Sequence, residues 1–462
     1  MREQNDSIIS ASDAPVGPGV LVSVFVPDDH PLLRLKRALD WKAITEVMTN
    51  QWRSSGKNVD GLRGQPWPVQ LYVPLLVLMW VESLHSRQME KYISESVVAR
   101  RFLDLTSQPS MWVRDHSNIA RAESALGAEG KAEVNALIIK TARELGFTNG
   151  AILSSDTTVQ EPAIGYPSEP AILKGWAERI ERSMKKLKKR GMKIAVEGIE
   201  KAREIYKRVK EYHLFAKTKE AKKKLLEPIL EQSEELKEKA NQVISQISQR
   251  CGEIKQKAAR RLKRMVEVAE VLVGQIKVWI KSGKTATDKI IHTGITKARA
   301  IVKRKGVVKF GLKWLINRIK GGYLFGKRVE ARADENLMPE EGLKDYREVM
   351  GEKATPRMVV YDRGASVSVV GPKLRKEGVR EVGIPPRGKA EWGVGEKEQK
   401  VVKSERGKTE GSIGRLKSRK YGFSHRQERS LDTQDGAGQR AIVSVNLNTL
   451  MRDLVEGEER RG

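Results

Sequence analysis

Apolar residues recur every three or four positions between Ala240 and Ile280, inside a lysine-rich part of the chain. This spacing places side chains on one face of an α-helix, so it predicts a continuous stripe packed in a long helical hairpin or a coiled-coil-like arrangement. The lysine-rich, helical character extends over residues 169–320. The stripe consists of Ala240, Ile244, Ile247, Cys251, Ile254, Ala258, Leu262, Met265, Ala269, Leu272, Ile276 and Ile280. A basic helical block is therefore expected in the middle of the chain.

The charge balance favours a polyanionic partner. The chain has 462 residues with 87 Lys and Arg against 59 Asp and Glu, a formal charge of +28. This length exceeds what one hydrophobic core usually serves, which predicts two or three structural units. Nucleic acid is the natural polyanion, whereas a solvated surface or a membrane-directed patch is the alternative. For the lysine-rich block, a solvated outer face and a DNA-contacting face are both compatible with the sequence.

The ends of the chain and its cysteine content predict a cytoplasmic protein. The single cysteine, Cys251, cannot form an internal disulfide, which is typical of a reducing compartment. The sequence MREQNDSIIS lacks the basic and apolar segments of a secretory signal. The longest apolar run, Val69 to Trp80, is too short to span a bilayer and predicts a buried helix.

Residues 26–149 predict a helical module. One helix is expected over residues 30–48, and Asp115 or Ser117 is expected to cap a second. A third helix should end at Gly146. His85 and His116 are isolated, so surface or core positions are expected for them.

The remaining segments predict an α/β sheet with helices on its faces. A strand is expected at residues 151–159, and strands and helices alternate again from Tyr323 onward. The expected order is strand 323–331, helix 340–351, strand 357–362, helix 372–378, strand 380–386, a helix that carries Glu410, and a final helix 437–455. Residues 456–462 are expected to be frayed.

Three acidic residues predict a two-metal phosphodiester site. Asp156 and Asp362 lie where two expected strands end, and Glu410 lies on a helix that follows. Two divalent ions that cleave a phosphodiester need carboxylates from separate elements, and open α/β sheets bind ligands at the carboxyl ends of their strands. Taken singly, each Asp is also typical of a turn or a cap, and Glu410 of an exposed helix position.

Two cations accompany Glu410. Arg406 precedes it by four residues and Lys417 follows it by seven. This spacing puts all three near one helix face, where the cations could hold phosphates or a flipped nucleotide. An ordinary ion pair between Arg406 and Glu410 is the simpler interpretation of that spacing.

These segments resemble bacterial insertion-sequence transposases of the DDE class, which have a ribonuclease H-like catalytic core. VPDDHPLLRLKRALDW is similar to the start of their helical N-terminal domain, SSDTTVQ to the first-aspartate strand, VVYDRG to the second, and EGSIGRLKSRKYGF to the glutamate segment. Arg406, Glu410 and Lys417 match a Tyr/Arg/Glu/Lys signature of one branch. Lys403 occupies the tyrosine position of this signature, and Ala365 occupies the position after DRG where an aromatic residue is often found. The subgroup, and whether cleavage passes through a hairpin, therefore stay open.

The resemblance implies a domain plan. The fold would be an α/β ribonuclease H-like core with a helical N-terminal domain and a long lysine-rich helical insertion. The parts would be an end-DNA-binding domain (1–149), the first core strand (150–168), the basic insertion (169–320), the rest of the core (321–455) and a tail (456–462). The insertion would also contact DNA or dimerise the protein.

The resemblance also implies a chemistry. Asp156, Asp362 and Glu410 would be the catalytic acids and hold two Mg²⁺ ions, with Mn²⁺ able to substitute, while Arg363, Arg406 and Lys417 would bind DNA. The partners would be the element's ends, target DNA and at least one more copy of the chain, in a bacterial cytoplasm, on the nucleoid when DNA is bound, with no membrane. A related nuclease that cuts without joining and a non-catalytic architectural nucleic-acid-binding protein are the alternatives.

Overall fold

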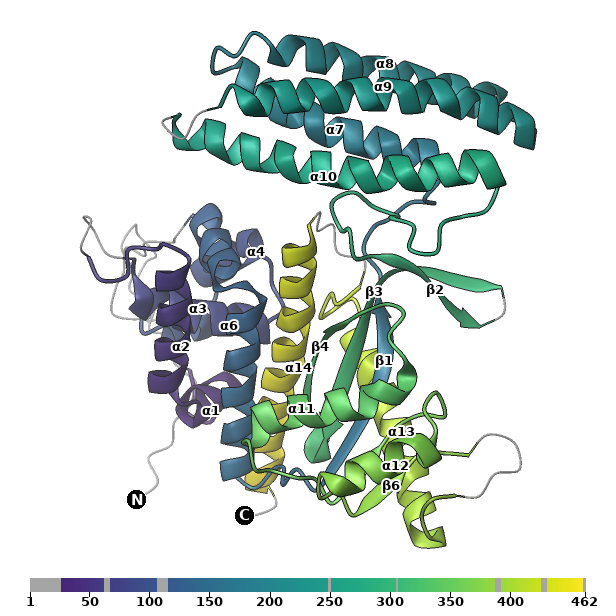
Figure 1. Ribbon diagram of the computed structural model, residues 1–462. Helices are drawn as coiled ribbons and strands as arrows, with labels where there is room; N and C mark the ends of the chain where they lie inside the picture. The colour runs from purple at the N-terminus through teal and green to yellow at the C-terminus, as the bar shows by residue number, and fades with distance from the viewer. Residues whose placement is uncertain are drawn as a thin grey trace, which may run out of the picture. The chain divides into compact units, whose positions relative to one another are not determined.

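The computed structural model is a mixed α/β protein (Figure 1) and describes residues 26–61, 67–105, 115–247, 251–304, 306–386, 392–424 and 430–459. The expected mixture of helices and sheet is therefore confirmed. The chain forms two compact units with separate hydrophobic cores. The first unit comprises Met1–Gln160, Lys313–Glu428 and Asp432–Gly462, and the second comprises Glu161–Leu312 with Arg429–Leu431.

The first unit begins with a helical module. Its helices are α1 (Pro31–Ala38), α2 (Trp41–Ser54), α3 (Val69–Val81), α4 (Ser86–Glu95), α5 (Val97–Phe102) and α6 (His116–Glu144). The single helix expected over residues 30–48 is wrong, because Asp40 interrupts it and caps α2 by accepting the N–H of Ala43 at 3.0 Å. The second and third expected helices form one element, α6, which begins after Asp115 and bends where Gly127 adopts a φ of 69°.

Helix α3 is the apolar run that predicted a buried helix. Its residues from Leu75 to Trp80 are at most 1% exposed, which confirms that prediction. Within the described ranges, no single helix is long and apolar enough to cross a membrane, although α3 and α4 pass such a test together as a pair bent by 100°.

A mixed sheet follows the helical module. Its strands are β1 (Ile152–Gln160), β2 (Arg299–Arg304), β3 (Val307–Ile319), β4 (Leu324–Val329), β5 (Met358–Val360) and β6 (Glu381–Gly383). The order is β2-β3-β1-β5-β6, and β4 also pairs with β3. β1, β5 and β6 are parallel neighbours. The associated helices are α11 (Met338–Met350), α12 (Val367–Lys376), α13 (Glu396–Leu416) and α14 (Leu431–Glu459), with short 3-10 turns η1 (Lys320–Gly322) and η2 (Glu335–Leu337).

Alternation along the strands gives the sheet two buried faces. Leu153, Val359 and Tyr361 join the core shared with the N-terminal helices. Met358 and Val360 point the other way and pack against Val402 of α13. Side chains two residues apart in a strand share a face, so the ends of β1 and β5 each present one side chain toward α13 and the next away from it.

Helix α14 contacts both the helical module and the sheet. Val443, Leu447 and Leu450 are fully buried in the shared core. The Asn446 side chain donates to Asn135 Oδ1 at 2.7 Å and accepts the backbone N–H of Leu324 at 2.8 Å. The helix extends to Glu459, so residues 456–459 are helical rather than frayed; residues 460–462 lie outside the described ranges.

The second unit contains the lysine-rich block, with helices α7 (Glu169–Lys188), α8 (Ala195–Phe215), α9 (Lys219–Ser245) and α10 (Glu253–Ser282). Each helix packs against others of the four. The predicted stripe from Ala240 to Ile280 is not continuous on one helix, because α9 ends at Ser245 and α10 starts at Glu253. Most of its residues on the two helices face one core, in the hairpin that was one of the two expected arrangements, but Ile254 is 46% exposed.

The expected helical character up to residue 320 is wrong at its end. Residues 299–304 and 307–319 form the antiparallel strands β2 and β3, with Val302 opposite Val308. In β3 the apolar residues Val308, Phe310, Leu312, Trp314 and Ile316 alternate with period two, which is the pattern of a strand.

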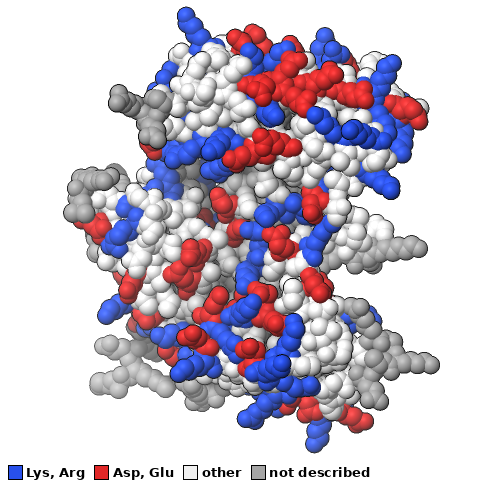
Figure 2. Space-filling model, viewed as in Figure 1, with Lys and Arg blue, Asp and Glu red and all other residues white. Residues whose placement is uncertain are grey.

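Many lysines of the second unit are paired with glutamates. Lys239 lies 2.6 Å from Glu197, and Lys277 lies 2.8 Å from Glu234. Figure 2 likewise shows Lys and Arg interspersed with Asp and Glu on the face in view. For these positions the solvated outer face is the better interpretation, since exposed pairs of this kind are typical of a helix surface.

Candidate active site

Asp156 lies in the middle of β1, not at the strand end that the sequence predicted, whereas Asp362 follows the end of β5 by two residues. Ile152 of β1 is paired with Met358 of β5, and Ser154 with Val360. These pairs end at Ser154 and Val360, and Asp156 and Asp362 each follow the last pair by two residues. Both carboxylates therefore belong to the region where β5 ends and β1 continues beyond it.

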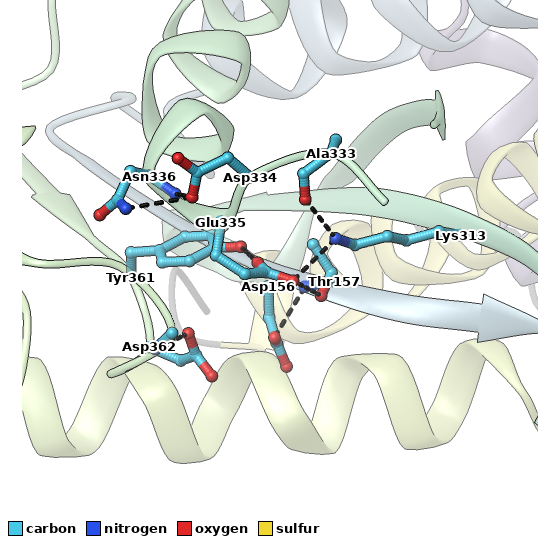
Figure 3. Close-up of polar contacts among 10 residues, drawn as sticks. Asp156, Thr157, Lys313, Ala333, Asp334, Glu335, Asn336, Tyr361 and Asp362 are labelled. Atoms are coloured by element: carbon cyan, nitrogen blue, oxygen red, sulfur yellow. Dashed lines mark hydrogen bonds and ion pairs between the residues drawn. The ribbon is translucent and has the colours of Figure 1, made fainter. Parts of the chain in front are cut away.

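Both acids belong to the face that α13 covers. The Thr409 hydroxyl of α13 donates to Ser154 Oγ at 2.7 Å, and Asp156 follows Ser154 by two residues on the same face. Figure 3 shows the Asp156 and Asp362 carboxylates directed to the same side, toward the helix that crosses below them. The structure therefore brings two of the three predicted acids together.

Backbone amides orient each carboxylate. Asp156 Oδ1 accepts the N–H of Thr157 at 2.7 Å, and Asp362 Oδ1 accepts the N–H of Gly364 at 2.6 Å. A Cβ atom at position 364 would lie 2.6 Å from Asp362 Oδ1. Glycine is thus required there for this orientation of Asp362.

Glu335 is a third carboxylate close to this region, on the opposite face. It opens the short turn η2, where Lys313 Nζ lies 2.8 Å from Glu335 Oε1. Tyr361 donates its hydroxyl to Glu335 Oε2, and Thr157 donates to Oε1 at 3.4 Å. No local pattern selects Glu335, because its partners come from β1, from β3 and from the residue that follows β5.

The phenol of Tyr361 is held in its protonated form. Burial raises the pKa of Tyr361 far above its usual value, and the negative charges of Glu335, Asp362 and Asp156 raise it further. A protonated phenol can donate a hydrogen bond, and the Glu335 carboxylate accepts it. Because the charges of Asp156 and Asp362 affect the pKa of Tyr361, both aspartates lie near this ring.

Glu410 stands apart from the acid pair. Its side chain is 64% exposed and lies 3.5 Å from Arg406, the ordinary i to i+4 pair that the spacing allowed. It directly follows Thr409, the residue that touches Ser154. Over the part of the chain that the structure describes, no three His, Cys, Asp or Glu side chains gather in a metal-binding arrangement.

The predicted DNA-binding cations occupy two places. Arg363 directly follows Asp362 and is exposed, whereas Lys417 is half-buried where α13 ends. Arg406 is partly exposed beside Glu410. Another residue of α13, Glu405, forms a buried ion pair with Arg318 at 2.6 Å, which anchors the helix on the sheet.

A cavity elsewhere in this unit contains neither aspartate. It measures about 720 Å³ and is lined by residues of α2, α6 and α14 that include Glu123, Lys131 and Arg440. Lys131 donates to the carbonyls of Glu123 and Gly127, and Arg440 pairs with Glu123 at 3.2 Å. Because its cations are already bound within the protein, the acid pair remains the better candidate site.

A comparison with protein families links the helical module to transposition. A family model described as a transposase domain (DUF772) matches residues 21–125, which include α1 to α5 and the start of α6. The match supports a transposase family, in agreement with the resemblance seen in the sequence. Neither the curated proteins nor the solved structures that were compared with the chain gave a match.

Proposed function

We propose that this chain is a DNA transposase of the DDE class, which cleaves a phosphodiester at each end of its element and joins the freed 3′ hydroxyl to target DNA. The observation that carries the proposal is the parallel pairing of β1 with β5, two residues beyond which Asp156 and Asp362 both lie. This pair occurs in a chain whose residues 21–125 match a transposase domain. A mixed sheet with two acids near the carboxyl end of β5 also supports a ribonuclease H-like core.

The acid pair has the donors that Mg²⁺ prefers. Magnesium is usually held by one or two carboxylates, with waters and substrate phosphates as its other ligands. Asp156 and Asp362 would supply those carboxylates, each oriented by a backbone N–H. The metal would stabilise the charge that develops on the phosphate oxygens.

Glu410 is proposed as the acid that completes the site and allows a second ion. The proposal is supported by its position next to Thr409, on the helix that covers the face of the acid pair. Arg406 would then exchange its contact with Glu410 for a DNA phosphate. Arginine suits that exchange because its guanidinium binds carboxylates and phosphates in the same bidentate geometry.

DNA would approach along cations at two places, beside Asp362 and along α13. Arg363 and Lys417 are the proposed contacts together with Arg406, and the formal charge of +28 favours association with a polyanion. Two element ends must be cut together, which calls for a dimer or larger assembly. The protein would act on the bacterial nucleoid and not at a membrane.

A non-catalytic DNA-binding protein is the second candidate. The separation of Glu410 from the two aspartates favours it, because a three-acid site is not assembled among the described residues. In that case DNA binding would be the whole activity, and the acid pair would be a turn feature.

Cleavage of labelled DNA that carries the element's own end, in Mg²⁺ or Mn²⁺, tests the proposal. Asp362→Asn keeps the shape of the side chain and removes its charge, so cutting and joining should fall by at least about a thousandfold while DNA binding persists. Glu352→Gln, an exposed acid in the loop before β5, is the matched control. Equal cutting by wild type and Asp362→Asn would refute the assignment, and cutting without joining would indicate the related nuclease.

A further inference from the structure

Three side chains converge on Glu335 from the face of the sheet opposite the acid pair. Lys313 lies 2.8 Å from Oε1, Thr157 donates to Oε1 at 3.4 Å, and Tyr361 donates to Oε2. Figure 3 shows Glu335 between Thr157 and Tyr361, with the carboxylates of Asp156 and Asp362 directed away from it.

Two of these partners are chain neighbours of the acids. Thr157 directly follows Asp156, and Tyr361 directly precedes Asp362. A single carboxylate therefore contacts Thr157 inside β1 and Tyr361 just after β5, one through each of its oxygens. The Tyr361 N–H also donates to the Gly383 carbonyl of β6 at 3.1 Å, but the pairing of β5 with β1 ends at Val360 and does not extend to Asp362.

Lys313 offsets the negative charge of Glu335. An uncompensated carboxylate beside two aspartates would repel them, since like charges at short range destabilise one another. The Lys313 side chain is only 8% exposed, and its ammonium also donates to the Ala333 carbonyl at 3.2 Å. The buried Lys313 ammonium is therefore held on Glu335, which, unlike Asp156 and Asp362, does not face α13.

We propose that Glu335 is a positioning residue, which sets the separation and orientation of Asp156 and Asp362 by holding Thr157 and Tyr361 together. The inference rests on the proposed function, since it assigns Glu335 a role in forming that metal site. We assign Glu335 no metal, since its oxygens contact Lys313 and Tyr361 on the face opposite the acid pair. Groups that orient metal ligands typically contribute tenfold or more to metal affinity.

Mn²⁺ binding to the full chain, measured by titration calorimetry, separates positioning from ligation. Glu335→Gln removes the charge but can keep both contacts, because its oxygen accepts from Lys313 and its N–H donates to the Tyr361 oxygen, so its Mn²⁺ affinity should stay within about threefold of wild type. Glu335→Ala removes the bridge and should weaken Mn²⁺ binding by about tenfold or more. Duplex DNA binding should not change in either variant.

Glu340→Ala is the matched control. Glu340 lies on α11, and its carboxylate pairs with Lys373 of α12 at 2.8 Å. Tyr361→Phe and Thr157→Val each remove one contact to Glu335 and should weaken Mn²⁺ binding less than Glu335→Ala does. These two variants keep the test decisive if Glu335→Ala does not fold.

Three results would count against the inference. Loss of binding in Glu335→Gln equal to that in Glu335→Ala would make Glu335 a ligand or a required charge. Unchanged affinity in a folded Glu335→Ala, or in both Tyr361→Phe and Thr157→Val, would leave it no positioning role. Wild-type protein that binds no Mn²⁺ would instead refute the proposed metal site, and the inference with it.

Discussion

Gly364 controls the orientation of Asp362. Its N–H donates to Asp362 Oδ1, and a Cβ atom at this position would lie 2.6 Å from the same oxygen, closer than real Cβ contacts allow. Gly364→Ala should therefore displace the carboxylate and lower Mn²⁺-dependent DNA cleavage by about tenfold or more, with DNA binding retained.

The matched control for Gly364→Ala is Gly274→Ala in α10, where an added Cβ meets nothing within 4 Å. Alanine there should stabilise the helix by about 0.5–1 kcal/mol, and cleavage should not change. Full cleavage by Gly364→Ala would show that Asp362 tolerates another orientation. Cleavage rates and thermal unfolding of both variants distinguish these cases.

Residues with a local sequence signal were the predictable part of the site. Asp156 and Asp362 were selected as residues that end apolar strands, which is correct for Asp362 after β5, whereas β1 continues past Asp156 to Gln160. Glu335 gives no such signal, because its role depends on contacts with Lys313, Thr157 and Tyr361 that only the folded sheet creates. Glu410 was selected from a motif, and a motif does not specify the direction in which an exposed side chain points.

At the scale of elements, the connection after α10 depends on a neutral histidine. His292 Nδ1 accepts the backbone N–H groups of Gly294 at 3.2 Å and Ile295 at 3.1 Å. Burial, together with the charge of Arg179, lowers the pKa of His292 from 6.5 to about 4. Between these values the unfolded chain binds more protons than the folded one, so stability falls as the pH falls from 6.5 to 4.

His292→Asn should remove this part of the pH dependence, because an asparagine oxygen can accept the same N–H groups without titrating. Thermal unfolding of the full chain from pH 7 to pH 4 measures the effect. The melting temperature of wild type should fall more steeply than that of the variant. Parallel curves would show that the His292 ring is not kept neutral in the folded protein.

Helices were more predictable than strands in this chain. The apolar spacing in α9 and α10 indicated buried helical faces, because a period of three to four residues follows directly from helix geometry. A continuous apolar run indicated the buried helix α3. β3 was missed because its lysines continue the composition of the preceding block, even though its apolar residues alternate. The break between α9 and α10 was also missed, since both arms of a hairpin carry the same stripe spacing.

At the scale of the whole molecule, two separate cores predict two independent responses to mutation. Leu76 is fully buried in the core of the first unit, and Leu262 in that of the second. Either leucine changed to alanine should cost about 2–5 kcal/mol. Scanning calorimetry should show Leu76→Ala lowering one transition and Leu262→Ala the other. A single transition lowered equally by both variants would show that the two cores unfold as one.

The connection between β1 and β5 has a consequence for how the protein is made. Asp156 emerges from the ribosome long before Asp362, and α14, which completes the shared core, is synthesised later still. Contacts so distant in sequence form slowly, because a long intervening segment must be ordered first. A growing chain thus acquires the helical module well before it can pair its two acids. Partial translation products would therefore lack the assembled acid pair.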